Sequence, residues 1–482
     1  MALVSSTLLS RTRPIISRLQ LARQGTTSSI PFTLIQIRAV ATMATPWQIR
    51  VSPDNTGILK WKQTEEAAAK VSELLQKDLE GTHHLLSLYA TGASPSTLEK
   101  AYAGNDSYQI SAKQFNPDVV KELKSGWSEG SPYLGKGDHY PDFLKFFQDE
   151  IADKGWEKVL QEYVFKGDER SEAIYGRLFA GFLHPLIQLM YGLEWKQPAI
   201  IAEGLAQAAV HENRVGGFLT KVEQAASSSP SSSSSSLINN KTPLPEIFET
   251  VIRQHSEKLA TSARFGDSNK IYDGVFVRAP DEALELLKHV TVGEGELEEK
   301  TAEMAHTCAY VAAAAAFHPP NAPKFDFFLI HHLNSVPFFV TLLSFPWLTP
   351  AQKARALEWK IRLDIVQYVA RGCPPLRLES IKRFTPKDAS ESSSVTKPED
   401  LLPRFHAIMD DGHTIKVVRA LLIARELSRR FADRPWIRFA DEETWLNVHR
   451  LLLESREGRF GASMWVRSAG FEEAWEDVPK EE

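Results

Sequence analysis

The sequence contains very little cysteine. Its 482 residues include two cysteines, Cys308 and Cys373, and they are not spaced as a CxxC pair. Two cysteines cannot form a disulfide framework, and a structural zinc site built on thiolates needs more of them. We therefore expect both thiols to be packing residues of a protein that folds in a reducing compartment.

Long uninterrupted hydrophobic stretches are also missing. The most apolar runs, TCAYVAAAAAF and VPFFVTLLSFPWL, are well short of the roughly 20 residues that cross a bilayer, so we expect no membrane span. The glycine motifs of nucleotide sites, GxGxxG after a strand and GxxxxGK[ST], do not occur, and neither does the GxSxG motif of serine hydrolases. The sequence therefore offers no recognisable site for a nucleotide cofactor.

Charge of one sign is concentrated only at the N-terminus. The 56 basic and 61 acidic residues are otherwise spread along the chain, and nothing predicts a nucleic-acid partner. The first 53 residues contain no Asp, Glu or Lys but six Arg among many Ser, Thr and Leu, which is typical of a mitochondrial transit peptide. We predict a disordered, transit-like leader at 1–45 and a mitochondrial location, or a cytoplasmic one if translation starts at Met43.

Helical periodicity is what the sequence has in abundance. Apolar residues recur at spacings of three and four in segments 64–80, 198–215, 280–290, 349–372 and 413–431. The segment from Thr349 opens with Thr-Pro and closes at Gly372, as helix caps do. Alternating, strand-like runs such as YDGVFVRA are few. We predict an all-α fold with one large multi-helix domain at 46–482, a disordered polyserine insertion at 227–242 and a polar loop at 387–400.

Several histidines lie within apolar, helical segments. A buried histidine is more often a hydrogen-bonded core residue than a ligand. Helical bundles, however, also build metal sites from side chains that project inward from facing helices. Spacing along the chain cannot decide between these readings, because the segments are far apart. The histidines in question are His83 and His84 in THHLLSLY, His184 in FAGFLHPL, His331 and His332 in FDFFLIHHLNSV, and His413 in DDGHTIKVV.

These segments carry a resemblance to a known family. In order along the chain, HHLLSLYATGASPSTLEKAY, GFLHPLIQLMYGLEWKQPAIIAEGLAQAAVHEN, FFLIHHLNSV, WLTPAQKARALEWKIRLDIVQYVARGCPPL and DDGHTIKVVRALL resemble the fungal questin oxidase-like family of polyketide-tailoring oxygenases. The resemblance implies a helical oxidoreductase that uses O2 to insert oxygen into an anthraquinone- or xanthone-type aromatic polyketide and open a ring. Two mechanisms are implied for the family: a non-haem iron oxygenase, and an NADPH-dependent Baeyer–Villiger-type monooxygenase without metal.

The iron mechanism implies ligands in this chain. The family pattern implies that His184, His331 and His413 bind the metal, together with a carboxylated lysine that we place at Lys360. Imidazole suits Fe(II), but neutral histidines leave its charge uncompensated in an apolar pocket, so an anionic ligand is needed. A buried lysine has a depressed pKa and could react with carbon dioxide to give that anion. The alternative is an ordinary lysine paired with a neighbouring carboxylate, Glu358 or Asp364.

The fourth imidazole is less defined. Members of the family tend to carry His-Asn-His just before the HHLL element, whereas this chain reads KDLEGTHHLL, with Glu80 at the second histidine's position. We assign His84 as the ligand; His83 or Glu80 could take its place, or the site could be incomplete and the protein a catalytically inactive homologue. As catalytic candidates we name Glu203, an acid in an apolar helix, and Asp411, which could orient His413 or cap the following helix.

Overall fold

A computed structural model describes most of the chain. The described residues are 43–77, 81–105, 114–128, 131–228, 238, 242–387, 395–458 and 464–481. The chain divides into two units, Met1–Met43 and Ala44–Glu482, and all the helices named below belong to the second. Nearly all of the 1–45 leader, most of the 227–242 insertion and part of the 387–400 loop lie outside the described residues, as does Glu80. The predictions of a targeting leader and of disorder in these segments stay predictions.

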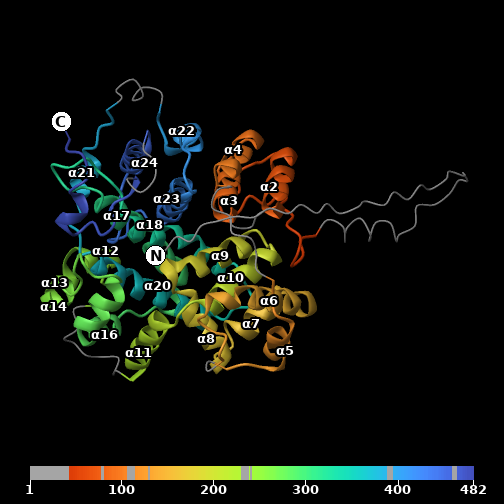
Figure 1. Cartoon of the computed structure of the whole chain (residues 1–482). Coiled ribbons are helices and arrows are strands. Elements are labelled where there is room, and N and C mark those ends of the chain that lie inside the picture. The colour runs from red at the N-terminus through yellow and green to blue at the C-terminus, as the bar shows by residue number, and fades with distance from the viewer. Residues whose placement is uncertain are drawn as a thin grey trace, which may run out of the picture. The chain divides into compact units, whose positions relative to one another are not determined.

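The predicted all-α class is confirmed. Within the described residues there are helices and isolated β-bridges but no β-strand, and none of the helices is long and apolar enough to cross a membrane. The first helices, which run from red to yellow in Figure 1, are α2 (Glu65–Lys77), α3 (Thr82–Ala90), α4 (Pro95–Asn105), α5 (Pro117–Ser125), α6 (Tyr140–Lys154), α7 (Trp156–Tyr163), α8 (Glu169–Leu178), α9 (His184–Glu194) and α10 (Pro198–Val210).

The remaining helices complete the fold. The middle of the chain forms α11 (Arg214–Ser228), α12 (Leu244–Glu246), α13 (Ile252–His255), α14 (Glu257–Ala260), α15 (Phe276–Arg278) and α16 (Pro280–Leu287). The last part forms α17 (Leu297–Ala314), α18 (Phe327–Asn334), α19 (Val336–Leu343), α20 (Pro350–Ala370), α21 (Leu378–Lys382), α22 (Leu402–Ala407), α23 (His413–Arg429) and α24 (Glu442–Arg456).

The longest helix, α20, shows how local sequence sets the boundaries. The backbone N–H of Gln352 donates to Thr349 Oγ1 at 3.2 Å, and the Gln352 side chain accepts from the Thr349 N–H at 2.9 Å. This reciprocal capping satisfies two donors that the first turn would otherwise leave unpaired. The helix ends at Ala370, just before Gly372, whose φ of 80° suits glycine. The predicted helix at 349–372 is thus confirmed.

The strand-like run YDGVFVRA is helical instead. Residues Lys270–Val275 form a π-helical turn that continues into α15. The Asn269 side chain accepts hydrogen bonds from the backbone N–H groups of Ile271 and Tyr272, both at 3.1 Å, and so starts the turn. A capping residue therefore overrides the alternating pattern at this position.

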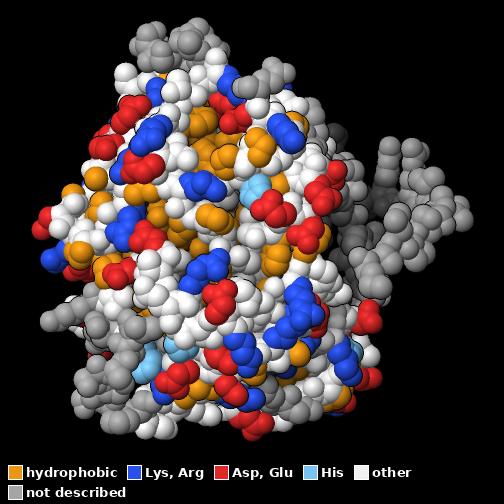
Figure 2. Space-filling view, turned by 90° about the vertical axis from the view of Figure 1, so that its left-hand side faces the viewer, with side chains coloured by type: hydrophobic (Ala, Val, Ile, Leu, Met, Phe, Trp, Pro, Cys, Tyr) orange, Lys and Arg blue, Asp and Glu red, His pale blue; other side chains and the backbone are white. Residues whose placement is uncertain are grey.

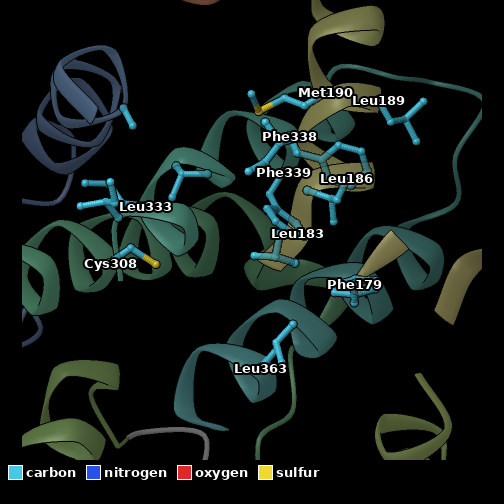
Figure 3. Packing of buried hydrophobic residues seen from close by; sticks show 14 of the residues in the cluster. Phe179, Leu183, Leu186, Leu189, Met190, Cys308, Leu333, Phe338, Phe339 and Leu363 are labelled. Atoms are coloured by element: carbon cyan, nitrogen blue, oxygen red, sulfur yellow. The ribbon is translucent and has the colours of Figure 1, made fainter. Parts of the chain in front are cut away.

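Four helices bring the candidate histidines together. Helix α3 packs against α9 and α23, and α18 packs against α23 and the turn before α9 (Figure 1). Their apolar sides belong to a hydrophobic cluster that extends through the unit. Figure 3 shows Leu183, just before α9, and then Leu186 and Met190 in succession along α9, with Phe338 and Phe339 of α19 beside them. On the face of the molecule in Figure 2, acidic and basic side chains alternate around apolar ones.

Candidate metal centre

Three histidines from separate helices meet at one point. The Nε2 atom of His331 lies 3.1 Å from Nε2 of His184 and 3.2 Å from Nε2 of His413. Among the described residues these three form a group whose possible ligand atoms all lie within 4.8 Å of one another. Imidazole nitrogens about 2.1 Å from one ion are separated by roughly 3.0–3.4 Å, so the observed spacing suits shared coordination. The predicted convergence of His184, His331 and His413 is found.

Hydrogen bonds on the far side of two rings fix their tautomers. His331 Nδ1 lies 2.5 Å from the carbonyl oxygen of Phe327, and His413 Nδ1 lies 2.6 Å from Asp411 Oδ1. Each acceptor requires an N–H on Nδ1, which leaves an unshared electron pair on Nε2. Two lone pairs therefore face each other at 3.2 Å. Such an arrangement is repulsive unless a cation lies between them.

A shared proton is a poor substitute for that cation. Burial lowers the pKa of His331 well below its usual value, and nearby positive charge on His413 or His184 would lower it further. Burial also lowers the pKa of His413, followed by the charge of Lys416. Both rings are therefore neutral near pH 7, which is the protonation state of a metal ligand.

A left-handed turn positions His184 at the first residue of α9. Gly181, Phe182 and Leu183 all have positive φ values, 54°, 57° and 67°. A non-glycine residue in this region costs about 1–3 kcal/mol, so the surrounding packing must hold the turn in place. Position 181 requires glycine, because the Cβ of any other residue would lie 2.4 Å from His211 Nε2. His184 is the solvent-accessible member of the three, whereas His331 and His413 are buried.

Gly412 and His84 together set the start of α23. Gly412 has a φ of 84°, and a Cβ there would lie 2.5 Å from the Cβ of His84. The two backbones thus approach closely, directly before His413. This contact makes His84 a packing partner of the turn, and the structure does not include it in the three-histidine group. Its assignment as the fourth ligand stays a prediction.

His83 also lies outside the three-histidine group, but one of its ring nitrogens is buried without a partner. Its ring stacks on Tyr191 at 4.9 Å, and it hydrogen-bonds the Gln188 side chain. Burial lowers its pKa well below the usual value, and the charges of Lys416 and His184 contribute. The charge of His184 acts on this ring, and its Nε2 is buried without a hydrogen-bond partner. Ligation of a metal would explain such an unpaired nitrogen.

Lys416 is the cation that faces the histidines. It lies one turn after His413 on α23 and is buried, with 7% of its surface exposed. Its positive charge lowers the pKa of His83, His184, His331 and His413. Among the described residues its ammonium has no hydrogen bond or ion pair. Burial lowers the pKa of Lys416 itself, which favours the free amine.

Lys360 belongs to a different buried group. Its Nζ contacts Asp364 and lies 3.3 Å from Cys308 Sγ, and Asp364 also accepts a hydrogen bond from His332 Nδ1 at 2.5 Å. Burial lowers the pKa of Lys360, but Asp364 and Cys308 together raise it above the usual value. The expected depressed pKa of Lys360 is therefore wrong, because an ion pair four residues along the same helix keeps the amine charged.

The two candidate acids take supporting positions. Asp411 hydrogen-bonds His413, while its neighbour Asp410 accepts from the backbone N–H of Thr414 at 3.0 Å and so performs the capping role. Glu203 Oε2 accepts from the Gln188 Nε2 at 2.7 Å. Because Gln188 also hydrogen-bonds His83, Glu203 is linked to His83 through Gln188. Both acids thus lie behind the imidazoles and hold them in place.

Comparison with known proteins places this site in a family. The family described as questin oxidase-like matches residues 81–421. The chain belongs to this family. The questin oxidase of Aspergillus fumigatus is 32% identical, with 91% of this chain and 100% of that protein covered. Oxidoreductase AflY of Aspergillus parasiticus is also 32% identical, with 90% of this chain and 94% of that protein covered. Baeyer–Villiger oxidase ptaJ of Pestalotiopsis fici is 30% identical, covering 90% and 99%.

The questin oxidase-like family is one of oxidoreductases, and the protein is an oxygenase of this kind. The resemblance on which the sequence prediction depended is confirmed. The structure brings His184, His331 and His413 together and includes neither His84 nor His83 in that group, and the charge of the buried Lys416 acts on all three. A signal for Lys416 was present: it lies three residues after His413, so it shares a helix face with that histidine.

Proposed function

We propose that the protein is a non-haem iron oxygenase that opens a ring of an anthraquinone- or xanthone-type aromatic polyketide with oxygen from O2. The single observation that carries this proposal is the pair of Nε2 lone pairs of His331 and His413 facing each other at 3.2 Å. Imidazole ligands suit Fe(II), and a carbonyl or carboxylate on the opposite ring nitrogen is the usual support of a metal-bound histidine. The substrate class is the one that the resemblance to the questin oxidase-like family implies, and the questin oxidase of Aspergillus fumigatus is among the relatives.

His184, His331 and His413 would hold the iron, with His83 as a fourth ligand. Four neutral imidazoles leave the ion's charge uncompensated, so an anionic ligand is needed. Lys416 could provide it: its free amine adds to carbon dioxide, forming an N–C bond and releasing one proton, and the carbamate oxygen becomes the ligand. Burial of Lys416 and its lack of an ion partner support this role.

The remaining residues position and insulate this group. Asp411 and the Phe327 carbonyl hold the rings of His413 and His331 so that Nε2 points inward. Glu203 holds Gln188, which in turn holds His83. Ferrous iron, when bound, supplies the electron-transfer chemistry that O2 needs in order to react with an organic ring. His184, as the exposed ligand, marks the side from which substrate and O2 can approach.

An NADPH-dependent Baeyer–Villiger reaction is the second candidate, favoured by the names of several relatives. The two candidates differ in electron balance. A monooxygenase puts one oxygen atom of O2 into the substrate and reduces the other to water with two electrons from NADPH. Ring opening that retains both oxygen atoms in the product needs no external reductant. The ratio of NADPH oxidised to O2 consumed therefore separates them.

Separate substitutions of Lys416 and Lys360 give the sharpest test. Iron-loaded wild type, Lys416→Ala and Lys360→Ala are compared for iron per folded chain and for O2 consumption with an anthraquinone substrate, with and without NADPH. We expect Lys416→Ala to lose iron and turnover. Lys360→Ala should keep iron but lose about 3–5 kcal/mol of stability, because it leaves the buried Asp364 carboxylate without its cation. Full iron and turnover in Lys416→Ala, or iron loss confined to Lys360→Ala, would overturn this assignment.

A further inference from the structure

A second feature of the fold is a cavity that contains an unpaired buried cation. Its volume is about 470 Å³, in the range of small-molecule sites. The apolar part of its wall includes Phe182, Leu183 and Phe328. In Figure 3, Phe179 and Leu363, which also line it, lie beyond Leu183 from the cluster of phenylalanines on α19. The cavity is therefore built on the same elements that carry the histidines.

The cavity lies directly beside the metal cluster. Phe182 and Leu183 precede His184, and Phe328 is three residues before His331. The rings of Phe182 and Phe328 meet edge to face at 4.8 Å, and the Phe182 ring is 6.5 Å from that of His331. A ligand in the cavity would contact this aromatic pair, which packs against His331, although none of the three histidines lines the cavity itself.

Arg371 is the unusual residue of the wall. It follows α20, is 4% exposed, and its guanidinium lies 4.0 Å above the Phe328 ring. One nitrogen, Nη1, donates to Ser468 Oγ at 3.2 Å, but the buried Nε has no partner. No carboxylate among the described residues lies within ion-pair distance of it. A buried guanidinium without a counter-ion is unfavourable, unless a ligand supplies the negative charge.

Asp326 is the acid whose charge acts on Arg371, but the two side chains form no ion pair. Its two carboxylate oxygens accept four backbone N–H groups: those of Phe328 and Leu329 on Oδ1, and those of Ser468 and Ala469 on Oδ2. Asp326 is therefore engaged in holding the C-terminal segment against α18, and Arg371 stays free to bind an anion.

Two further basic residues add to the positive charge of the wall. Lys270 and Arg467 also line the cavity. Its one acidic lining residue, Glu212, is hydrogen-bonded to Tyr272. The wall thus combines aromatic rings with an excess of positive charge, which matches a flat aromatic ligand that carries an ionised oxygen.

We propose that Arg371 recognises an anionic oxygen, carboxylate or phenolate, of the aromatic substrate and holds it in this cavity beside the histidines. The inference rests on the proposed function for the identity of the substrate, but its test needs no turnover. Bidentate or charge-assisted hydrogen bonds to the guanidinium give the ionised compound an advantage over a neutral one of the same shape. Arg371 is then a specificity-determining residue.

The test is calorimetric binding to the full-length protein, with and without iron. Two matched pairs of probes separate the sources of the anion: anthraquinone-2-carboxylate against its carboxamide, and 2-hydroxyanthraquinone against 2-methoxyanthraquinone. At least one charged probe should bind wild type tenfold or more tightly than its neutral partner. In Arg371→Met that ratio should fall below threefold while affinity for the neutral probe is unchanged. Arg371→Lys, which keeps the charge, should retain part of the preference.

Arg362→Met is the matched control, because Arg362 is also a buried arginine of the α20 segment but does not line the cavity. It should keep the wild-type ratio. If Arg371→Met does not fold, the wild-type ratio and the Arg371→Lys variant still decide. Equal binding of charged and neutral probes to wild type, or an unchanged ratio in Arg371→Met, would overturn the proposal. An Arg371-dependent ratio in a protein that binds no iron would contradict the proposed function alone.

Discussion

His306 and His331 are both buried imidazoles on neighbouring helices, α17 and α18, yet their nitrogens have opposite surroundings. His306 Nδ1 lies 2.9 Å from Ser428 Oγ, and its Nε2 accepts the backbone N–H groups of Arg438 at 2.8 Å and Phe439 at 3.3 Å. Both nitrogens of His306 are thus satisfied by the protein. His331 has one satisfied nitrogen, and its other faces two more histidines.

This difference shows what distinguishes a ligand from a core residue. Burial lowers the pKa of both side chains, so neither burial nor a shifted pKa distinguishes the proposed metal ligand from the core histidine. What distinguishes the proposed ligand is an inward nitrogen whose tautomer leaves a lone pair that no donor satisfies. The same comparison separates Lys416 from Lys360: one buried amine lacks an ion partner, and the other has Asp364.

The largest effect is expected from substituting His331, the histidine of this pair whose Nε2 has no donor partner. His331→Ala should lower ring-opening activity by more than about 100-fold, because losing a ligand exceeds the 10–100-fold loss typical of its supporting residues. Without iron, its melting temperature should fall less than that of His306→Ala, because the variant relieves facing lone pairs. Steady-state O2 uptake and thermal unfolding check both parts; retained turnover would remove His331 from the site.

The satisfied histidine should show the opposite pattern. His306→Ala leaves the N–H groups of Arg438 and Phe439 without their acceptor and opens a cavity, so we expect a loss of about 2–4 kcal/mol in the free energy of unfolding. Iron per folded chain should stay at the wild-type level. Urea unfolding followed by metal analysis gives both quantities. Loss of iron from well-folded His306→Ala would mean that the two histidines are not functionally distinct.

A smaller effect should come from the carboxylates before α23. Asp411→Ala removes the acceptor that fixes the His413 ring, so iron should bind about 10–100-fold more weakly. Asp410→Ala is the control: it weakens the helix cap, at a cost of about 1 kcal/mol, and should leave iron affinity within a few-fold. Competition with a chelator measures the affinities. Equal weakening in both variants would show that only the shared turn matters.

Much of the fold was predictable from local pattern. The helices at 64–80, 198–215, 280–290, 349–372 and 413–431 were expected from apolar spacing and cap residues, and the structure contains α2, α10, α16, α20 and α23 there. The π-helical segment Lys270–Val275 was not, since its YDGVFVRA pattern alternates as a strand does. There a single capping side chain, Asn269, decided the outcome.

The site was predictable to the level of segments but not of neighbouring residues. His184, His331 and His413 each stand in an apolar segment that the family resemblance singled out. The choice between His83 and His84 depends on which way a helix faces, because adjacent residues differ by about 100°. That direction is set by contacts distant in sequence, such as the stacking of His83 on Tyr191. The ion pair of Lys360, in contrast, was visible as an acid four residues later.

The central claim is that the facing nitrogens of His184, His331 and His413 bind an iron ion. The most direct test is iron stoichiometry after anaerobic reconstitution with Fe(II) and removal of loosely bound metal, measured on wild type and on His331→Ala, with His306→Ala as the control. The account predicts about one iron per chain in wild type and in folded His306→Ala, and almost none in His331→Ala. Wild type without bound iron, or iron retained in His331→Ala, would contradict it.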